Sequence, residues 1–190
     1  MLDVVAVESR LGYRFRDKTL LETALTHSSF VNEHGGISNE RLEFLGDALV
    51  NFIAAELLYT AGGDEGHMTE RRKRIVSKTP LANAATRLGL DGFLQKGRGE
   101  RTLSEKTVSD IFEAVAAAIY LDGGLEACRA FVTANLQEAD IVDYKSALQQ
   151  YAQKTYGNGA VRYVNAEKSP FTSVVFLQNK EIGTGKGRNT

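Results

Sequence analysis

Five carboxylates in two short stretches of the chain have the types and the spacing of metal ligands. Glu40, Glu43 and Asp47 fall within roughly a 60° arc when they are projected on a helix with about 100° per residue. Asp110 and Glu113 stand one helical turn apart in a later stretch. Because like charges repel more strongly as a site loses water, converging carboxylates persist only when they bind protons or cations. The two rows therefore indicate a site for metal cations.

The ligand atoms in both rows are oxygens, without a His or Cys among them. Such ligands favour Mg²⁺, with Mn²⁺ as a substitute, over Zn²⁺. Mg²⁺ that is held by few carboxylates completes its coordination shell with water and substrate phosphate. The pattern indicates metal-assisted cleavage of a phosphodiester. For a single carboxylate pair at i, i+3, an ordinary solvated helix face is the simpler explanation.

Two amphipathic helices must position these carboxylates. Leu42, Leu45 and Leu49 gather on the side opposite the first row, and Phe112 and Val115 lie opposite the second. If the two apolar faces pack into one core, the two acidic rows meet at the edge of that core. We therefore expect the helix over 39–60 and the later acidic helix that extends to residue 121 to be neighbours.

The rest of the first 140 residues is also expected to be helical. The pattern predicts two short helices between residues 8 and 29, a loop over 31–38, a helix that begins near Met68, a helix with Thr79 as N-cap and Pro80 at its first position that ends at Gly89, and a helix over 125–136. The loop over 96–100 is basic and contains two glycines.

The pattern changes after residue 140. A helix over 144–156 is followed by three short segments rich in β-branched or aromatic residues, at 161–164, 172–177 and 181–185, with a hairpin turn at 178–180. We expect a mainly α protein: an all-helical domain over 1–140, followed by a small, incomplete α+β domain over 143–190.

The charge of the chain differs between these two parts. Residues 1–140 hold 16 Lys and Arg against 21 Asp and Glu, whereas residues 141–190 hold 7 against 3. An acidic metal site followed by a basic module suits an enzyme that acts on a polyanion. Chance variation across a short tail is the alternative explanation.

The composition argues against a membrane or secreted protein. With 43% hydrophobic and 25% charged residues the sequence fits a soluble globular protein, and its start lacks the features of a secretory signal. The single cysteine, Cys128, excludes an internal disulfide framework and is expected to be structural. We expect a cytoplasmic protein without membrane contact.

Residues 40–47 resemble the signature of ribonuclease III, the double-stranded-RNA endonuclease. Further blocks resemble the same family in the same order, at residues 25–29, 64–68, 88–90, 97–100, 110–114 and 118–124. Together these blocks cover nearly all of residues 8–135. The resemblance is specific because it rests on many ordered motifs.

The resemblance implies roles for the acidic residues. Glu43, Asp47, Asp110 and Glu113 are the implied metal ligands, with Asp47 and Glu113 as catalytic residues, and Glu40 and Glu65 support the site or the dimer around it. It also implies a homodimer in which each subunit cuts one strand of double-stranded RNA. The products carry 5′-phosphate and 3′-hydroxyl ends with short 3′ overhangs, as in the processing of rRNA and mRNA precursors.

Basic residues of the first domain are candidates for phosphate contacts. A-form RNA is recognised through its shape, its phosphates and its 2′-hydroxyls. Arg71, Arg72, Arg74 and Arg98 could supply such contacts, and solvated surface charge is the alternative for each of them.

The segment from residue 143 resembles the opening of a double-stranded-RNA-binding domain, in which Gln149 and Gln153 are the implied RNA contacts. It departs from that family because residues 169–171 lack the usual Gly-Pro-x-His loop, and because the chain ends where a lysine-bearing second helix is expected. We therefore expect this module to contribute little to RNA affinity.

A non-catalytic relative that binds or scaffolds RNA is the alternative function. Such a protein would carry substitutions among the metal ligands, and all four implied ligands are present in this sequence. A catalytic ribonuclease is therefore the favoured interpretation.

Overall fold

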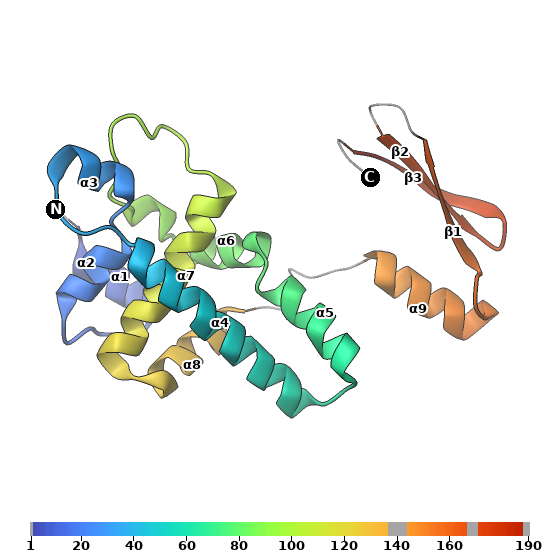
Figure 1. Ribbon diagram of the computed structural model, residues 1–190, viewed down its shortest axis with the longest axis horizontal. Coiled ribbons are helices and arrows are strands. Elements are labelled where there is room, and N and C mark those ends of the chain that lie inside the picture. Colours follow the sequence, from blue (N-terminus) through green and yellow to red (C-terminus); the bar gives the residue numbers. More distant parts are fainter. Residues whose placement is uncertain (1, 137–143, 167–170, 188–190) are drawn as a thin grey trace. The chain divides into compact units, whose positions relative to one another are not determined.

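The computed structural model describes residues 2–136, 144–166 and 171–187 (Figure 1). The chain divides into two compact units, Met1–Ile141 and Val142–Thr190. The first is built from helices, and the second from one helix and an antiparallel sheet. A mainly helical architecture followed by a small α+β module confirms the fold class expected from the sequence.

Helices make up the regular structure described in the first unit. They are α1 Val4–Leu11, α2 Lys18–Ala24, α3 Ser28–His34, α4 Glu40–Ala61, α5 Glu65–Ile75, α6 Lys78–Arg87, the 3₁₀ turn η1 Asp91–Phe93, α7 Glu105–Gly123 and α8 Leu125–Asn135. Asp3, Asp17, Asp64 and Ser104 act as N-caps, and each side chain accepts a hydrogen bond from a backbone N–H in the first turn of its helix. The sequence therefore marks these four helix starts by local chemistry.

Helix α7 lies in the middle of the first unit, where α2, α4, α6 and α8 pack against it (Figure 1). Ile111, Phe112, Val115 and Ile119 are fully buried along α7. Its fully buried alanines, at positions 114 and 116–118, have short side chains that let neighbouring helices approach closely. Most sides of α7 are therefore buried against neighbouring helices, while Asp110 and Glu113 lie at the edge of the core.

Several helix boundaries differ from those expected. Helix α1 begins four residues before Glu8, and α3 occupies part of the segment expected as a loop. Helix α5 begins at Glu65 rather than near Met68, because Asp64 accepts a hydrogen bond from the backbone N–H of His67 at 2.8 Å. The acidic residue Glu65 is thus part of the helix.

The start of α6 and the end of α7 also differ from the positions expected from the sequence. Ser77 is the N-cap of α6, so Pro80 lies at the third helical position and not at the first. Proline, which lacks a backbone N–H, is tolerated there because the N–H groups of the first helical turn have no intrahelical acceptor. Helix α7 continues beyond Leu121 through Asp122 to Gly123. Asp122 is therefore a buried helical residue and not part of a cap.

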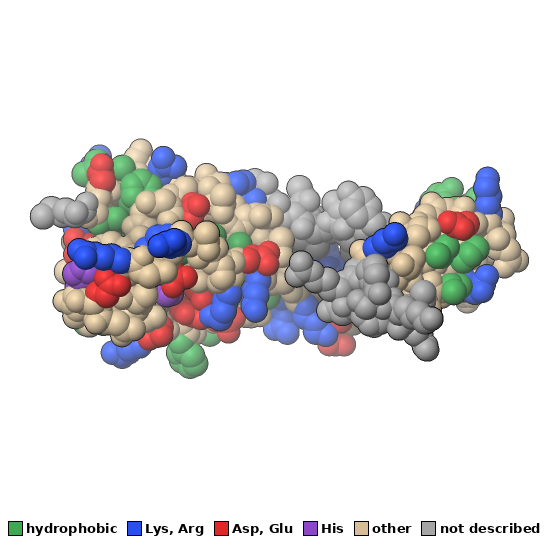
Figure 2. Space-filling model, turned by 90° about the horizontal axis from the view of Figure 1, so that it is seen from above, with side chains coloured by type: hydrophobic (Ala, Val, Ile, Leu, Met, Phe, Trp, Pro, Cys, Tyr) green, Lys and Arg blue, Asp and Glu red, His purple; other side chains and the backbone are tan. Residues whose placement is uncertain are grey.

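The second unit consists of α9 Tyr144–Tyr156, β1 Val161–Ala166, β2 Phe171–Leu177 and β3 Lys180–Gly187. The strands form an antiparallel sheet in the order β1-β2-β3. Gln178 and Asn179 have φ of 48° and 64°, as in a tight hairpin turn of the expected kind. Apolar side chains, including Val164 and Ile182, remain exposed on this small unit (Figure 2).

Helix α4 is long and apolar enough to cross a membrane by length and composition alone. Its first eight residues include Glu40, Glu43 and Asp47, and its buried side packs along α7. A core helix of a soluble protein can have the same length and hydropathy as a membrane span, so these two properties are weak evidence for a membrane segment.

Candidate metal centre

Helices α4 and α7 come into backbone contact at Gly46. A Cβ atom placed on Gly46 would lie 1.9 Å from the carbonyl oxygen of Glu113 and 2.4 Å from its carbonyl carbon. Only glycine allows this approach, because any side chain would force the helices apart. Gly46, which lies between the expected metal ligands Glu43 and Asp47, thus allows the two acidic rows to come together.

Three carboxylates converge where the helices meet. One oxygen each of Glu43, Asp110 and Glu113 lies within 4.8 Å of the other two. The three side chains are half-buried and line a cleft of about 770 Å³, together with residues of α6 such as Leu81. Oxygen ligands at this spacing fit a hard divalent cation, and the open cleft leaves room for water and phosphate in its coordination shell.

Two further acidic residues line the same cleft outside this group. Asp47 is exposed, and Asn51 donates a 3.0 Å hydrogen bond to its carboxylate. Glu40 is also exposed and accepts a 2.9 Å hydrogen bond from the Ser38 hydroxyl. Both face the cleft from α4, but neither belongs to the tight group of three.

The electrostatics of the cleft favour binding of a cation. Burial, followed by the negative charges of Asp47, Asp110 and Glu43, raises the pKa of Glu113 to about 8, while Lys106 acts in the opposite direction. A carboxyl group in this position binds a proton readily because too few positive charges compensate its neighbours. A divalent cation would supply the missing charge.

Lys106 is a residue of this site that the sequence did not reveal. Its Nζ donates hydrogen bonds to Asp110 at 2.6 Å and to Glu43 at 3.1 Å. The hydrogen bond to Asp110 has the largest effect and raises the pKa of Lys106. Burial acts in the opposite direction, and the hydrogen bond to Glu43 raises the pKa further. The i, i+4 spacing between Lys106 and Asp110 was the available signal, since such pairs meet on a helix face. Its contact with Glu43 depends on the packing of α7 against α4.

Glu65 and Arg72 lie on α5, away from the carboxylate cleft. They line a separate hollow of about 390 Å³ between α4 and α5, with Phe52, Tyr59 and Met68. Thr69 donates a 3.0 Å hydrogen bond to Glu65. The other candidate RNA contacts of this helix, Arg71 and Arg74, belong to the same basic segment.

Arg98 lies in the basic loop, which is attached to α3 by its backbone. The N–H of Arg98 donates to Glu33 at 2.8 Å, and the N–H of Gly97 donates to the Ser29 hydroxyl at 3.0 Å. The Arg98 side chain is exposed. In the second unit, Gln149 and Gln153 are exposed on α9.

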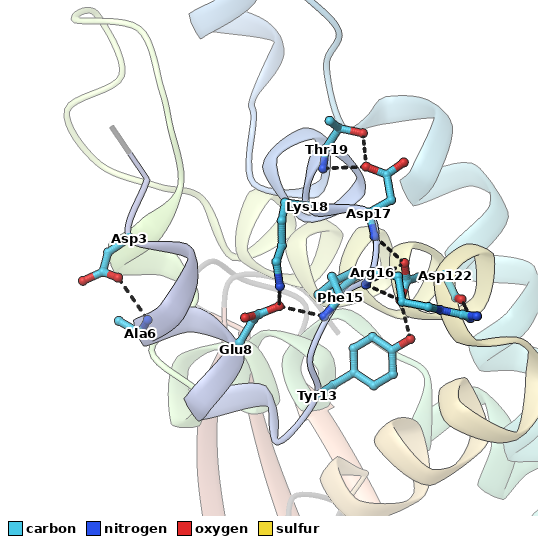
Figure 3. Close-up of polar contacts among 10 residues, drawn as sticks. All are labelled: Asp3, Ala6, Glu8, Tyr13, Phe15, Arg16, Asp17, Lys18, Thr19 and Asp122. Carbon is cyan, nitrogen blue, oxygen red and sulfur yellow. Dashed lines mark hydrogen bonds and ion pairs between the residues drawn. The ribbon is translucent and has the colours of Figure 1, made fainter.

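Asp122 forms a second acidic centre, at the C-terminal end of α7, that sequence reasoning missed. Its carboxylate accepts hydrogen bonds from the Tyr13 hydroxyl at 2.6 Å and from the backbone N–H groups of Arg16 and Asp17, the latter at 2.8 Å (Figure 3). The Arg16 guanidinium also donates to the Asp122 carbonyl. These bonds hold the segment between α1 and α2 against α7.

Glu8 has a similar role beside this segment. Its side chain accepts a 2.7 Å hydrogen bond from the backbone N–H of Phe15 and pairs with Lys18 (Figure 3). Phe15 is buried, and its ring packs edge-on against Tyr13. Glu8 and Asp122 therefore both bind the segment between α1 and α2 and attach it to neighbouring helices.

Comparisons with known proteins agree with this arrangement of a helical unit and a small sheet. The family model described as Ribonuclease-III-like matches residues 17–139, and the one described as double-stranded RNA binding motif matches residues 144–190. Ribonuclease 3 of Protochlamydia amoebophila is 38% identical over 202 residues, which cover 96% of this chain and 84% of the relative. Ribonuclease 3 of Symbiobacterium thermophilum is 41% identical over 199 residues, which cover 94% and 84%.

A solved structure gives the same result for the first unit. The nuclease domain of ribonuclease III from Campylobacter jejuni superimposes with a TM-score of 0.66 at 33% sequence identity, covering 73% of this chain and 99% of that one. Both the sequence and the fold therefore place this chain in the ribonuclease III family.

Proposed function

We propose that this protein is a divalent-metal-dependent endonuclease that cleaves double-stranded RNA. The observation that carries the proposal is the group formed by Glu43, Asp110 and Glu113, whose carboxylate oxygens meet within 4.8 Å in an open cleft. The match of residues 144–190 to a double-stranded RNA binding motif supports the substrate. Mg²⁺ is the proposed cofactor and Mn²⁺ its substitute, because all donors are carboxylate oxygens.

The four proposed metal ligands are Glu43, Asp47, Asp110 and Glu113, and Asp47 and Glu113 are the proposed catalytic residues. When bound, the metal supplies the Lewis acidity that activates water for in-line attack on the phosphodiester. Glu43, Asp110 and Glu113 hold their oxygens in one place because α4 and α7 are locked together at Gly46. Asp47 projects into the cleft from the same helix as Glu43 and adds negative charge.

RNA is proposed to contact both units. The contacts are Arg71, Arg72, Arg74 and Arg98 in the first and Gln149 and Gln153 in the second, and Glu40 and Glu65 support the acidic site or the dimer. The exposed side chains of Arg98 and of both glutamines are available to a large ligand. The proposed domains are residues 1–140, with the nuclease activity, and 143–190, which bind RNA.

A homodimer is proposed because apolar side chains project from α4 into solvent. Phe44 is 82% exposed, Tyr59 78% and Phe52 50%. Large exposed apolar side chains along one helix are typical of a protein interface, and the structure from C. jejuni is described as having a region involved in dimer formation. Two-fold symmetry would present two cleavage sites to the two strands of a duplex.

The proposed products carry 5′-phosphate and 3′-hydroxyl ends with short 3′ overhangs, and the proposed role is processing of rRNA and mRNA precursors in the cytoplasm. A non-catalytic RNA scaffold is not favoured, because the relatives named Ribonuclease 3 match nearly the whole chain and the proposed metal ligands are all present.

A cleavage assay tests the proposal. The protein should cut a long RNA duplex in Mg²⁺ or Mn²⁺ and should be inactive in EDTA, and it should leave single-stranded RNA of the same sequence intact. End labelling would identify the 5′-phosphate and the overhang. Binding of the duplex without cleavage in either metal would instead support the scaffold function.

A further inference from the structure

Lys106 contacts two carboxylates at the position where a divalent cation would be bound. Its Nζ lies 2.6 Å from Asp110 Oδ2 and 3.1 Å from Glu43 Oε1. The same two side chains belong to the group of oxygens that meet within 4.8 Å. The ammonium group and a divalent cation would therefore use the same negative charges.

We propose that Lys106 is an internal counterion that holds Glu43 and Asp110 together before metal binds, and that the metal must displace its ammonium group. The inference rests on the proposed metal site and adds a residue that sets its affinity. Lys106 lowers the apparent affinity for metal, and in return it keeps the two helices from being pushed apart by like charges.

The exposure of the three side chains makes the exchange possible. The Lys106 side chain is 58% exposed, whereas those of Glu43 and Asp110 are 28% and 17% exposed. A lysine on the rim has a flexible four-carbon stem and can turn into solvent without disturbing the core. Glu43 and Asp110 lie on helices α4 and α7, which pack against each other, so a divalent cation can take over the role of the lysine without a rearrangement of the core.

Lys78 provides a matched control. It lines the same cleft and is exposed, but among the described residues it forms no ion pair or hydrogen bond with the carboxylates through its side chain. A change of Lys78 to methionine removes the same charge from the same cleft. It therefore separates direct competition from the general effect of net charge.

The test measures binding of Mn²⁺ to the metal-free full chain by calorimetry, without RNA. Lys106→Met should bind Mn²⁺ more tightly than the wild type by on the order of tenfold, since two positive charges a few ångströms apart no longer compete for the same ligands. Lys106→Arg should bind close to wild type, and Lys78→Met should change the affinity by less than about twofold, because a solvated charge is strongly screened.

A second readout uses thermal unfolding of the same proteins. Without metal, Lys106→Met should unfold at a lower temperature than wild type, and saturating Mn²⁺ should remove most of that difference. Equal or weaker Mn²⁺ binding by Lys106→Met would overturn the inference while leaving the metal site intact. Absence of Mn²⁺ binding by both wild type and Lys106→Met would instead overturn the proposed site itself.

Discussion

Helix α7 places carboxylates in opposite environments along its length. In its first half, Asp110 and Glu113 lie close to Glu43 in a cleft, and repulsion contributes to raising the pKa of Glu113 to about 8. At its end, Asp122 accepts hydrogen bonds from the Tyr13 hydroxyl and from two backbone N–H groups. Burial alone would raise the pKa of Asp122, but these hydrogen bonds lower it below its ordinary value.

The difference separates a binding site from a structural contact. A carboxylate that is surrounded by donors of the protein contributes to the stability of the fold. The carboxylates of the cleft have fewer donors, since Lys106 serves both Glu43 and Asp110, and their negative charge is fully compensated only when a cation arrives from solution. One helix thus carries both kinds of acidic centre, and substitutions at the two centres should have different consequences.

The largest effect is expected for Glu113→Gln, which should reduce cleavage by on the order of a thousandfold, because the metal supplies several kcal/mol of transition-state stabilisation. The fold should remain intact, since glutamine is close to glutamate in size and does not repel the neighbouring carboxylates. Single-turnover cleavage and thermal unfolding of the same preparation would test both parts. A cleavage rate near that of wild type would remove Glu113 from the metal site.

The next largest effect is expected for Gly46→Ala, which pushes α4 away from α7. A Cβ at this position collides with the backbone of Glu113, and overpacking at a rigid contact costs about 3 kcal/mol. Both stability and cleavage should fall, because the two rows of carboxylates separate. Urea unfolding measures the loss.

Gly92→Ala is the control for Gly46→Ala, because a Cβ on Gly92 would meet no atom within 4 Å. It should change stability by less than about 0.5 kcal/mol. A Gly46→Ala protein as stable and active as Gly92→Ala would show that the helices can separate without cost.

A smaller effect, restricted to stability, is expected for Asp122→Ala. Tyr13 and the backbone N–H groups of Arg16 and Asp17 lose their acceptor, and breaking such a network costs about 2 to 3 kcal/mol. Cleavage per folded molecule at low temperature should stay within about twofold of wild type, a change of less than 0.5 kcal/mol in the barrier.

Glu126→Ala is the matched control, because the Glu126 side chain is 84% exposed and its removal should be nearly neutral. A severe loss of cleavage in folded Asp122→Ala would show that Asp122 also affects the carboxylate cleft. It would contradict the distinction between a binding site and a structural contact.

The smallest effect is expected from acid. Burial raises the pKa values of Asp122 and Glu8, but hydrogen bonds outweigh it, and both pKa values lie below their ordinary values of 3.8 and 4.5. The unfolded chain then binds more protons than the folded chain, so stability falls as the pH drops. Their contribution is complete above about pH 5 and is lost as the pH falls through about 4 towards the lowered pKa values.

Thermal unfolding between pH 7 and pH 3 would measure this dependence. Asp122→Asn should unfold at a lower temperature at pH 7 and should lose less stability than wild type below about pH 4. Parallel curves for the two proteins would show that Asp122 does not titrate in this range.

The sequence by itself determined the helical class, the two acidic rows and the α+β character of the C-terminal segment. These features depend on spacing along the chain: a helix brings residues three and four apart onto one face, and a strand alternates its faces. Glu40, Glu43 and Asp47 are close in sequence, so their common face could be read directly. The resemblance to a family added roles for these residues.

Tertiary structure decided which carboxylates meet. Glu43 and Asp110 are far apart in sequence, and the contact of Gly46 with Glu113 fixes how closely their helices approach. That approach brings three carboxylates into a tight group and leaves Asp47 outside it.

The role of Asp122 was also hidden in the sequence, where it resembled part of a helix cap before two glycines. Its partners Tyr13 and Arg16 lie more than 100 residues away. Local periodicity carries no information about such pairs, because they form only when the chain packs and buried polar groups must find partners.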